Sequence, residues 1–282
     1  MITVENLNFS YTKQPFIKDI SFTVSDGEIF GFLGPSGAGK STLQKILIGI
    51  IKNYSGSVTV GGTETKNIEN SFYEKIGIDF EFPSFYEKLS ARKNLQFFSS
   101  LYDGEKRSID QLLKDVGLYN DADKKAGDFS KGMKSRLNFI KALVHDPQLL
   151  FLDEPTSGLD PANSRLIKDL IIFEKKRGKT IILTTHNMED AADLCDRVAF
   201  IVDGNIKALD TPHNLIMKKS ASDIIYSYKE NGEEITSSCP LGETASDEKL
   251  RSLICENKIL TIHSREQSLG DVFMEVTGRR LS

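Results

Sequence analysis

The order of apolar residues predicts a strand, a loop and a helix near the N-terminus. Residues 28–33 form a mostly apolar run that is typical of a buried strand. Downstream, one apolar face recurs at helical spacing, at Leu43, Ile46, Leu47, Ile50 and Ile51. Upstream, residues 20–24 alternate between apolar and polar side chains, as a half-buried strand does. Asp26-Gly27 then predicts a hairpin turn into the strand at 28–33.

Two further apolar runs, residues 149–152 and 180–185, predict strands that are buried on both faces. The first run leads into Asp153 and Glu154, and the second leads into His186. Ligands bind at the carboxyl ends of the strands in open parallel sheets, so we expect these polar residues to meet the loop after residue 33. Because adjacent side chains of a strand point to opposite faces, Asp153 and Glu154 are predicted to take different roles.

Two helices are predicted between these strands. Ser90 is a predicted N-cap, and the helix after it carries Leu95, Phe98, Leu101 and Tyr102. The helix after Ser130 carries Met133, Leu137, Ile140 and Val144. Nine aromatic residues lie between residues 71 and 103, out of 17 Phe and 8 Tyr in the chain. Most of these rings would fill the core of a small helical subdomain, and a minority could line a groove for a partner.

The pattern becomes less regular after Pro212. Strands are predicted at residues 224–226 and 258–263, with a hairpin at Asn231-Gly232. The last helix is clearer, because Ser268 and Asp271 are spaced as a capping box and Gly278 can end the helix. Residues from about 216 to 282 are therefore predicted to form a small α+β appendage.

The composition, 39% hydrophobic and 27% charged residues in 282, is that of a globular chain with one large domain and an appendage. The net charge of −4 gives no electrostatic argument for binding nucleic acid. Three cysteines without metal-ligand spacing indicate a reducing compartment. The start has no signal-peptide pattern, and no apolar run reaches the ~18 residues of a membrane helix. We therefore expect a soluble, intracellular chain.

The loop after residue 33 fits the phosphate-loop pattern of two glycines, Lys and Ser or Thr. It consists of Gly34, Pro35, Ser36, Gly37, Ala38, Gly39, Lys40, Ser41 and Thr42. Glycines allow backbone N–H groups to turn toward phosphate oxygens, where a Cβ would obstruct them. Lys40 can supply a positive charge to the β- and γ-phosphates, and the Ser41 hydroxyl can bind Mg²⁺. The loop predicts a site for a nucleoside triphosphate.

These motifs occur in an order that resembles the nucleotide-binding subunit of ATP-binding cassette (ABC) transporters, over about residues 1–215. The residues that carry the resemblance are Tyr11, Gly34 to Thr42, Ser130-Lys131-Gly132-Met133, Leu149 to Glu154, Ser157 to Asp160, and His186. The resemblance implies an α/β fold of the P-loop NTPase class. It would have an N-terminal antiparallel β-subdomain, a helical signature subdomain at about residues 80–146 and the C-terminal appendage.

The resemblance also implies the ligands and the role of each residue. ATP and Mg²⁺ would bind between the phosphate loop of one subunit and the Ser130 and Gly132 edge of another, in a head-to-tail dimer. Tyr11 would stack on adenine, Asp153 would help to hold Mg²⁺, and Glu154 would polarise the attacking water. His186 would contact the γ-phosphate, and Asp160 would link the two sites across the dimer.

The chain departs from the family's pattern at two places. Glu81 stands where the family has a glutamine near the metal, and a carboxylate can accept a hydrogen bond from a metal-bound water but cannot donate one. In the signature motif, Lys131 replaces a glycine and Met133 replaces a glutamine. Similar variants occur in the branch that exports drugs, antibiotics and bacteriocins, and the segment 268–278 resembles the ending of that branch.

The favoured function is therefore the ATPase subunit of an exporter, bound at the cytoplasmic face of the cell membrane through a separately encoded permease. The second nucleotide-binding domain would come from an identical or a related chain. A soluble ABC ATPase that acts on ribosomes or DNA is disfavoured by the acidic charge and by the single cassette. A third hypothesis, motivated by Glu81 and Lys131, is a nucleotide-gated regulatory module with little turnover.

Overall fold

A computed structural model describes residues 1–217, 223–230, 232–264 and 267–278. The chain divides into two compact units, of which the first comprises Met1–Asp210 and the second begins at Thr211. This division lies close to the boundary expected after residue 215.

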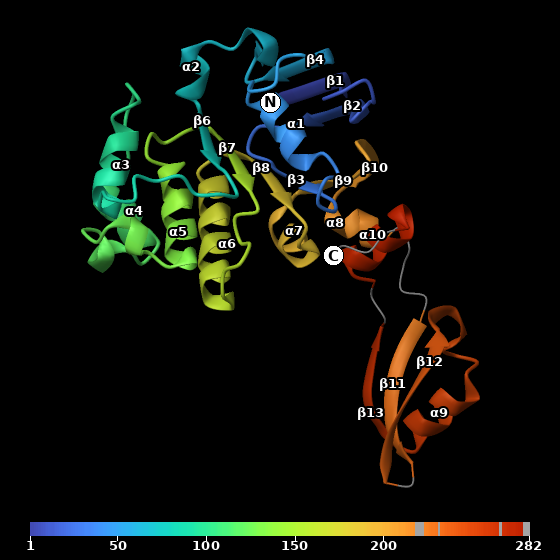
Figure 1. Ribbon diagram of the computed structural model, residues 1–282. Helices are drawn as coiled ribbons and strands as arrows, with labels where there is room; N and C mark the ends of the chain where they lie inside the picture. The colour runs from blue at the N-terminus through green and yellow to red at the C-terminus, as the bar shows by residue number, and fades with distance from the viewer. Residues whose placement is uncertain (218–222, 231, 265–266, 279–282) are drawn as a thin grey trace. The chain divides into compact units, whose positions relative to one another are not determined.

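The first unit is built on a six-stranded sheet in the order β10-β9-β3-β8-β7-β6 (Figure 1). The strands are β3 (Ile29–Leu33), β6 (Ile76–Asp79), β7 (Leu149–Asp153), β8 (Thr180–Thr185), β9 (Arg197–Val202) and β10 (Asn205–Asp210). All neighbours pair in parallel except β9 and β10. The strands predicted at 28–33, 149–152 and 180–185 are confirmed. Because β3, β6, β7 and β8 run in one direction, the segments that follow them leave the same edge of the sheet.

A second sheet of the same unit is antiparallel, in the order β2-β1-β4-β5. It comprises β1 (Ile2–Phe9), β2 (Ile17–Val24), β4 (Ser55–Val60) and β5 (Thr63–Glu64). The predicted N-terminal β-subdomain is confirmed, but the predicted hairpin at Asp26-Gly27 is wrong. β2 pairs with β1, whereas β3 pairs with β8 and β9, so the turn connects two sheets. The physical reason is the burial of the two strands. Every residue of β3 is buried, as in a central strand of a parallel sheet that is covered on both faces, whereas β2 alternates and buries only one face.

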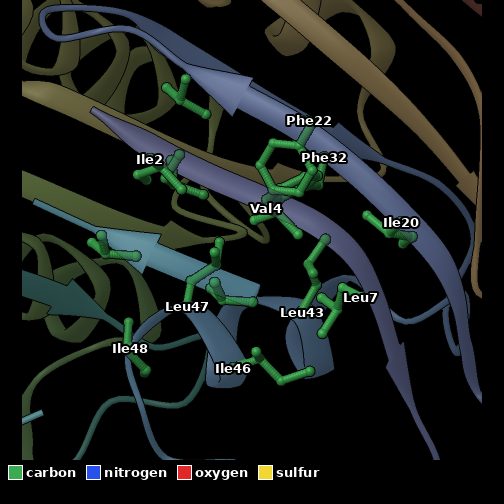
Figure 2. Packing of buried hydrophobic residues seen from close by; sticks show 14 of the residues in the cluster. Ile2, Val4, Leu7, Ile20, Phe22, Phe32, Leu43, Ile46, Leu47 and Ile48 are labelled. Carbon is green, nitrogen blue, oxygen red and sulfur yellow. The ribbon is translucent and has the colours of Figure 1, made fainter. Parts of the chain in front are cut away.

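The main core lies between the two sheets and helix α1 (Lys40–Leu47). Figure 2 shows Ile2, Val4 and Phe22 of the antiparallel sheet packed with Phe32 of β3 and with the apolar face of α1. This packing confirms the predicted helix and its apolar face at Leu43, Ile46 and Leu47, which are buried. It also fixes the start of α1, and hence the phosphate loop, against β3.

Helix α1 ends earlier than its apolar spacing predicts. Gly49 has φ +74, and the Ile50 N–H donates to the Lys45 carbonyl at 2.9 Å, as in a C-terminal cap that stops a helix. Ile50 is consequently 57% exposed. The prediction that Ile50 and Ile51 continue the helical face is therefore wrong, because a left-handed glycine interrupts the helix before them.

The other helices of this unit are α2 (Asn70–Tyr73), α3 (Ala91–Ser99), α4 (Ile109–Asp115), α5 (Lys131–Lys141), α6 (Pro161–Lys176) and α7 (Met188–Leu194). Helices α3, α4 and α5 pack against one another (Figure 1). The predicted cap at Ser90 is confirmed, because its side chain accepts from the Lys93 N–H at 3.2 Å. Ser130 caps α5 in the same way, by accepting from the Met133 N–H at 3.2 Å. Leu101, Tyr102 and Val144 lie beyond the ends of their helices.

A buried histidine follows α5. The His145 ring stacks on Tyr102 with centroids 3.7 Å apart, and its Nε2–H donates to the Ile76 carbonyl at 2.8 Å. Its Nδ1 is buried and has no hydrogen-bond partner within the described part of the chain. Burial lowers the pKa of His145, although the Ile76 carbonyl opposes this shift. The folded chain thus holds His145 neutral at pH values where the unfolded chain is protonated.

We expect this histidine to make the fold sensitive to acid. The unfolded state binds one more proton below about pH 6.5, so the free energy of unfolding falls by up to ~1.4 kcal/mol per pH unit as the pH drops further. His145→Gln keeps a donor for Ile76 but does not titrate, so its stability should fall less between pH 7 and pH 5. Urea unfolding at several pH values measures this, with His263→Gln, at an exposed position, as control. Identical pH dependence of His145→Gln and the unchanged chain would contradict it.

The second unit contains a three-stranded antiparallel sheet in the order β12-β11-β13. Its elements are α8 (Pro212–Met217), β11 (Asp223–Glu230), β12 (Glu233–Pro240), α9 (Glu248–Cys255), β13 (Ile259–Ser264) and α10 (Leu269–Thr277). The capping box of Ser268 and Asp271 and the end at Gly278 are confirmed. β11 and β12 pair up to Glu230 and Glu233, while Asn231 of the predicted hairpin lies outside the described residues. Among the described helices, none is long and apolar enough to cross a membrane.

Candidate functional site

A cavity of about 260 Å³ lies where the segments after β3, β6, β7 and β8 converge. It is lined by Phe16, Ser36, Gly37, Gly39, Lys40, Ser41, Thr42, Glu81, Asp153, Glu154 and His186. The predicted meeting of the phosphate loop, the acidic pair and the histidine at one edge of a parallel sheet is confirmed. The order of the strands explains it, because these four strands are immediate neighbours.

The phosphate loop has the backbone conformation that its glycines permit. Gly37 and Gly39 have φ +79 and +113, and a Cβ at position 39 would lie 2.8 Å from Ile17 Cδ1. Gly39 is the N-cap of α1 and makes no side-chain cap, so the N–H groups of the first turn are not capped by a side chain. A glycine-lined loop that leads into a helix N-terminus fits a phosphate group, because backbone N–H groups there can bind its oxygen atoms.

Lys40 lies at the centre of the cavity wall and is 8% exposed. Its Nζ donates to the carbonyls of Gly34 at 2.5 Å and Pro35 at 3.2 Å, so these residues shape the loop without lining the cavity. Burial lowers the pKa of Lys40, while the charges of Glu154, Asp153 and Glu81 oppose this shift. Ala38 is buried behind the loop.

Asp153 and Glu154 line the same cavity, which the alternation of side chains along a strand does not predict. The reason is that β7 ends at Asp153 and Glu154 adopts φ +52, a left-handed conformation that is strained for a residue other than glycine. The Glu154 N–H still donates to the Thr184 carbonyl at 3.0 Å. Asp153 is buried and accepts a hydrogen bond from the Thr184 hydroxyl. The two carboxylates thus have different surroundings, although they face one space.

The Glu154 carboxylate is held on both oxygens by the segment that ends β8. The Thr185 hydroxyl donates to Oε2 at 3.2 Å, and His186 Nδ1–H donates to Oε1 at 2.9 Å. A carboxylate only accepts hydrogen bonds, so the proton of His186 lies on Nδ1. Glu154 and His186 therefore form one unit that can orient a water molecule beside a bound phosphate.

Phe16 lines the cavity, where only Tyr11 was expected from the sequence. Tyr11 is 59% exposed and does not line the cavity, while its hydroxyl lies 3.0 Å from the Thr42 Oγ1. Phe16, which the sequence analysis missed, lines the cavity and contacts the Tyr11 ring edge-on, with centroids 5.4 Å apart. The available signal was a second aromatic residue directly before the strand that begins at Ile17.

Ser130, Gly132 and Asp160 do not line this cavity. Ser130 caps α5, and Asp160 caps α6 by accepting from the Asn163 N–H at 3.1 Å. Lys131 lies over Gly158, which has φ +69, and a Cβ at position 158 would overlap the Lys131 Nζ. The first turn of α5 therefore contacts the segment before Asp160 within the same chain.

Glu81 lies between this cavity and a second one of about 360 Å³. The second cavity shares Glu81 and Glu154 with the first and is also lined by Phe82, Pro83, Phe129, Lys131, Lys134, Ser135 and Ser157. Glu81, which follows β6, thus connects the phosphate cavity to the region around α5.

Comparison with known proteins shows the family to which this chain belongs. A sequence profile described as "ABC transporter" matches residues 17–157. The chain is 50% identical to the fluoroquinolones export ATP-binding protein of Mycobacterium tuberculosis (strain H37Rv), over 100% of this chain and 95% of that protein. It is 37% identical to the Nod factor export ATP-binding protein I of Rhizobium meliloti (strain 1021), over 99% of this chain and 89% of that protein.

Solved structures show the same fold. An ATP-binding subunit of an ABC transporter superposes with a TM-score of 0.72 at 28% identity, covering 77% of this chain and 92% of that chain. The cbiO1 protein of Clostridium perfringens superposes with a TM-score of 0.68 at 30% identity, covering 77% and 91%. This chain belongs to the ABC transporter family and is an ATP-binding subunit that hydrolyses ATP.

Proposed function

We propose that this chain powers an exporter through ATP-driven, head-to-tail dimerisation of two nucleotide-binding domains. It would dock on a separately encoded integral membrane permease at the cytoplasmic face of the cell membrane. The observation that carries the proposal is a match over the whole chain to proteins named for the export of fluoroquinolones and Nod factors. The cavity around Lys40, Asp153, Glu154 and His186 supports the ATPase part of the proposal.

Ser41 and Asp153 are the residues that would hold Mg²⁺, with Glu81 near its hydration shell. All three offer oxygen atoms to the cavity, and hard divalent cations prefer oxygen ligands. When bound, Mg²⁺ would neutralise negative charge on the phosphates. Glu81 adds a third carboxylate, which distinguishes this cavity from one with a neutral amide at that position.

Glu154 would polarise the attacking water, and His186 would keep its carboxylate oriented. The strained backbone at Glu154 and the two hydrogen bonds from Thr185 and His186 restrict the positions that the carboxylate can adopt. A base held in place before the substrate arrives needs less reorganisation during the reaction. Lys40 would contact the β- and γ-phosphates from the opposite wall.

The outer side of ATP would be completed by another subunit. Ser130 and Gly132 stand at the uncovered start of α5, an eleven-residue helix whose N-terminus favours anions. Because neither residue lines the cavity of its own chain, a second copy or a related chain would have to supply this edge. Asp160, at the start of α6, would contact the partner near the same place.

The nucleobase would bind at the ring pair of Tyr11 and Phe16. We expect Tyr11→Ala and Phe16→Ala each to weaken ATP binding by about 5- to 100-fold, because stacking on an aromatic ring contributes ~1–3 kcal/mol per base. Tyr11→Phe keeps the ring and should change affinity only a few-fold. Competition titrations with tripolyphosphate, which has no base, serve as the control. Equal weakening of tripolyphosphate and ATP binding would contradict a base site here.

Co-purification tests the proposed assembly. The chain is expressed with the membrane proteins encoded beside its gene and isolated in detergent through a tag on this chain. We expect an integral membrane protein to co-purify and to stimulate ATP hydrolysis. A stable assembly that contains ribosomes, DNA or soluble proteins and no membrane protein would contradict the proposal.

A further inference from the structure

The segment that leads from β6 to Glu81 is held by a single buried side chain of α5. The Asn138 amide donates one hydrogen bond to Oδ1 of the Asp79 carboxyl group and another to the Phe80 carbonyl, the latter at 2.8 Å. Asp79 and Asn138 are 4% and 2% exposed. Both acceptors lie within two residues of Glu81, so α5 fixes the backbone from which Glu81 projects.

This polar pair is costly to bury, which indicates a specific role. Burial raises the pKa of Asp79 to about 8, although Lys141 and the Asn138 amide oppose the shift. Asn138 also leaves its own Oδ1 buried without a hydrogen-bond partner among the residues that the structure describes. Two apolar residues of similar size would avoid both penalties. The amide is thus oriented by its two acceptors in the segment before Glu81, and not by partners within α5.

A second contact holds the far side of the same segment. The Lys141 Nζ donates to the Ser84 carbonyl at 3.4 Å, and it lies 5.0 Å from the centroids of both Phe85 and Phe98. Lys141 is one turn of α5 beyond Asn138. Glu81 therefore lies in a stretch of chain, residues 79–85, that is attached to α5 at both ends.

The same helix begins at the residues proposed to meet ATP of a second subunit. Ser130 is the N-cap of α5, and Asn138 lies two turns along it, in one uninterrupted run of helix. A displacement of the start of α5 would therefore move Asn138, and with it the backbone at Asp79 and Phe80. Glu81 would change its position in the phosphate cavity as a result.

We infer that Asp79 and Asn138 are positioning residues: through their hydrogen bond, the position of Glu81 in the phosphate cavity depends on the position of α5. This inference rests on the proposed function, because it requires that the start of α5 contacts the ATP bound by a second subunit and moves when it does so. Neither residue lines the cavity. Asp79 also lies within electrostatic range of Asp153, so Asn138 is the residue whose effect on hydrolysis would be exerted through Glu81.

A matched asparagine in the same subdomain provides the control. Asn94 of α3 is fully buried and donates to the carbonyls of Tyr86, Leu89 and Ser90 at 3.1, 3.3 and 3.0 Å. The Asn94 Oδ1 also accepts from the Tyr86 N–H at 2.9 Å, so Asn94→Ala removes four side-chain hydrogen bonds and Asn138→Ala removes two, but Asn94→Ala leaves the contacts to Asp79 and Phe80 intact. Asp79→Asn is the conservative variant, because an amide can accept from Asn138 Nδ2 and also donate to its Oδ1.

The first readout separates kcat from ATP affinity. We expect Asn138→Ala to lower kcat at least tenfold and to change the Kd of ATP less than twofold. Asn94→Ala should keep kcat within twofold although its melting temperature falls at least as far as that of Asn138→Ala, and Asp79→Asn should keep at least a third of kcat. An equal loss of kcat in Asn94→Ala and Asn138→Ala, or an unchanged kcat in Asn138→Ala, would overturn the inference.

The second readout needs no turnover. The chain contains no tryptophan, so Phe82→Trp, at a position 80% exposed beside Glu81, places a single emitter in this segment. We expect Mg²⁺ and ATP to shift its emission, the Asn138→Ala background to abolish that shift, and the Asn94→Ala background to keep it. A shift that persists in Asn138→Ala would overturn the coupling. If the Phe82→Trp chain without a further substitution did not bind ATP, that result would instead contradict the proposed function.

Discussion

Replacing Glu154 by glutamine preserves ATP binding and lowers the hydrolysis rate by about 100-fold or more, the usual contribution of a general base. The amide keeps the size of the side chain and can still meet Thr185, but it cannot take a proton from water. Steady-state hydrolysis and equilibrium binding of ATP measure the two effects separately. Glu189→Gln, at an exposed position of α7, is the control and should hydrolyse ATP at the unchanged rate.

The same experiment distinguishes an ATPase from a nucleotide-gated regulatory module. If the unchanged chain and Glu154→Gln hydrolyse ATP at equal, negligible rates in the assembled transporter, turnover is not the role of this cavity. Glu81 and Lys131 depart from the family's pattern, so the next variants to test would then be Glu81→Gln and Lys131→Gly. We expect instead a clear difference between the two rates.

Lys40→Ala weakens ATP binding by about 10- to 150-fold, because a charged hydrogen bond to phosphate contributes ~1.5–3 kcal/mol and this site has one such lysine in its loop. Burial disfavours the charged form of Lys40, so we expect the chain to stay folded when this side chain is removed. Isothermal titration with ATP measures the affinity. Lys45→Ala, on the exposed face of α1, is the control. Undiminished ATP affinity in Lys40→Ala would contradict the assignment of the phosphate loop.

The fold was predictable wherever one periodicity dominated the sequence. The apolar runs at β3, β7 and β8 indicated central parallel strands, and the serines at positions 90 and 130 marked the starts of α3 and α5. The sequence does not show which sheet each strand joins, and for this reason the hairpin predicted at Asp26-Gly27 is wrong. Strand pairing depends on packing between distant segments, whereas turn residues report only the local backbone.

The site was predictable where chemistry requires a fixed residue type. Lys40, Asp153, Glu154 and His186 meet as expected, since each follows a strand of the same sheet. The orientation of Glu154 was not predictable, because it depends on a left-handed backbone that the sequence does not mark with a glycine.

Phe16 and Asn138 were missed for a related reason. Phe16 reaches the cavity only because β2 lies beside the phosphate loop, where Ile17 limits the space at Gly39. Asn138 is a polar residue outside the apolar face predicted for its helix, so periodicity does not mark it as buried. Its partner Asp79 lies on β6, and the pairing of the two is a tertiary contact.

The central claim, a site completed by a second subunit, is tested most directly by the mass of Glu154→Gln in solution. Light scattering with Mg²⁺ and saturating ATP should show the mass double from that of the 31.5 kDa monomer. Adding Gly132→Asp should keep ATP binding and abolish the doubling, because a carboxylate would then face the partner's phosphates. A chain that binds ATP but stays monomeric, or a Gly132→Asp variant that still dimerises with ATP, would contradict the claim.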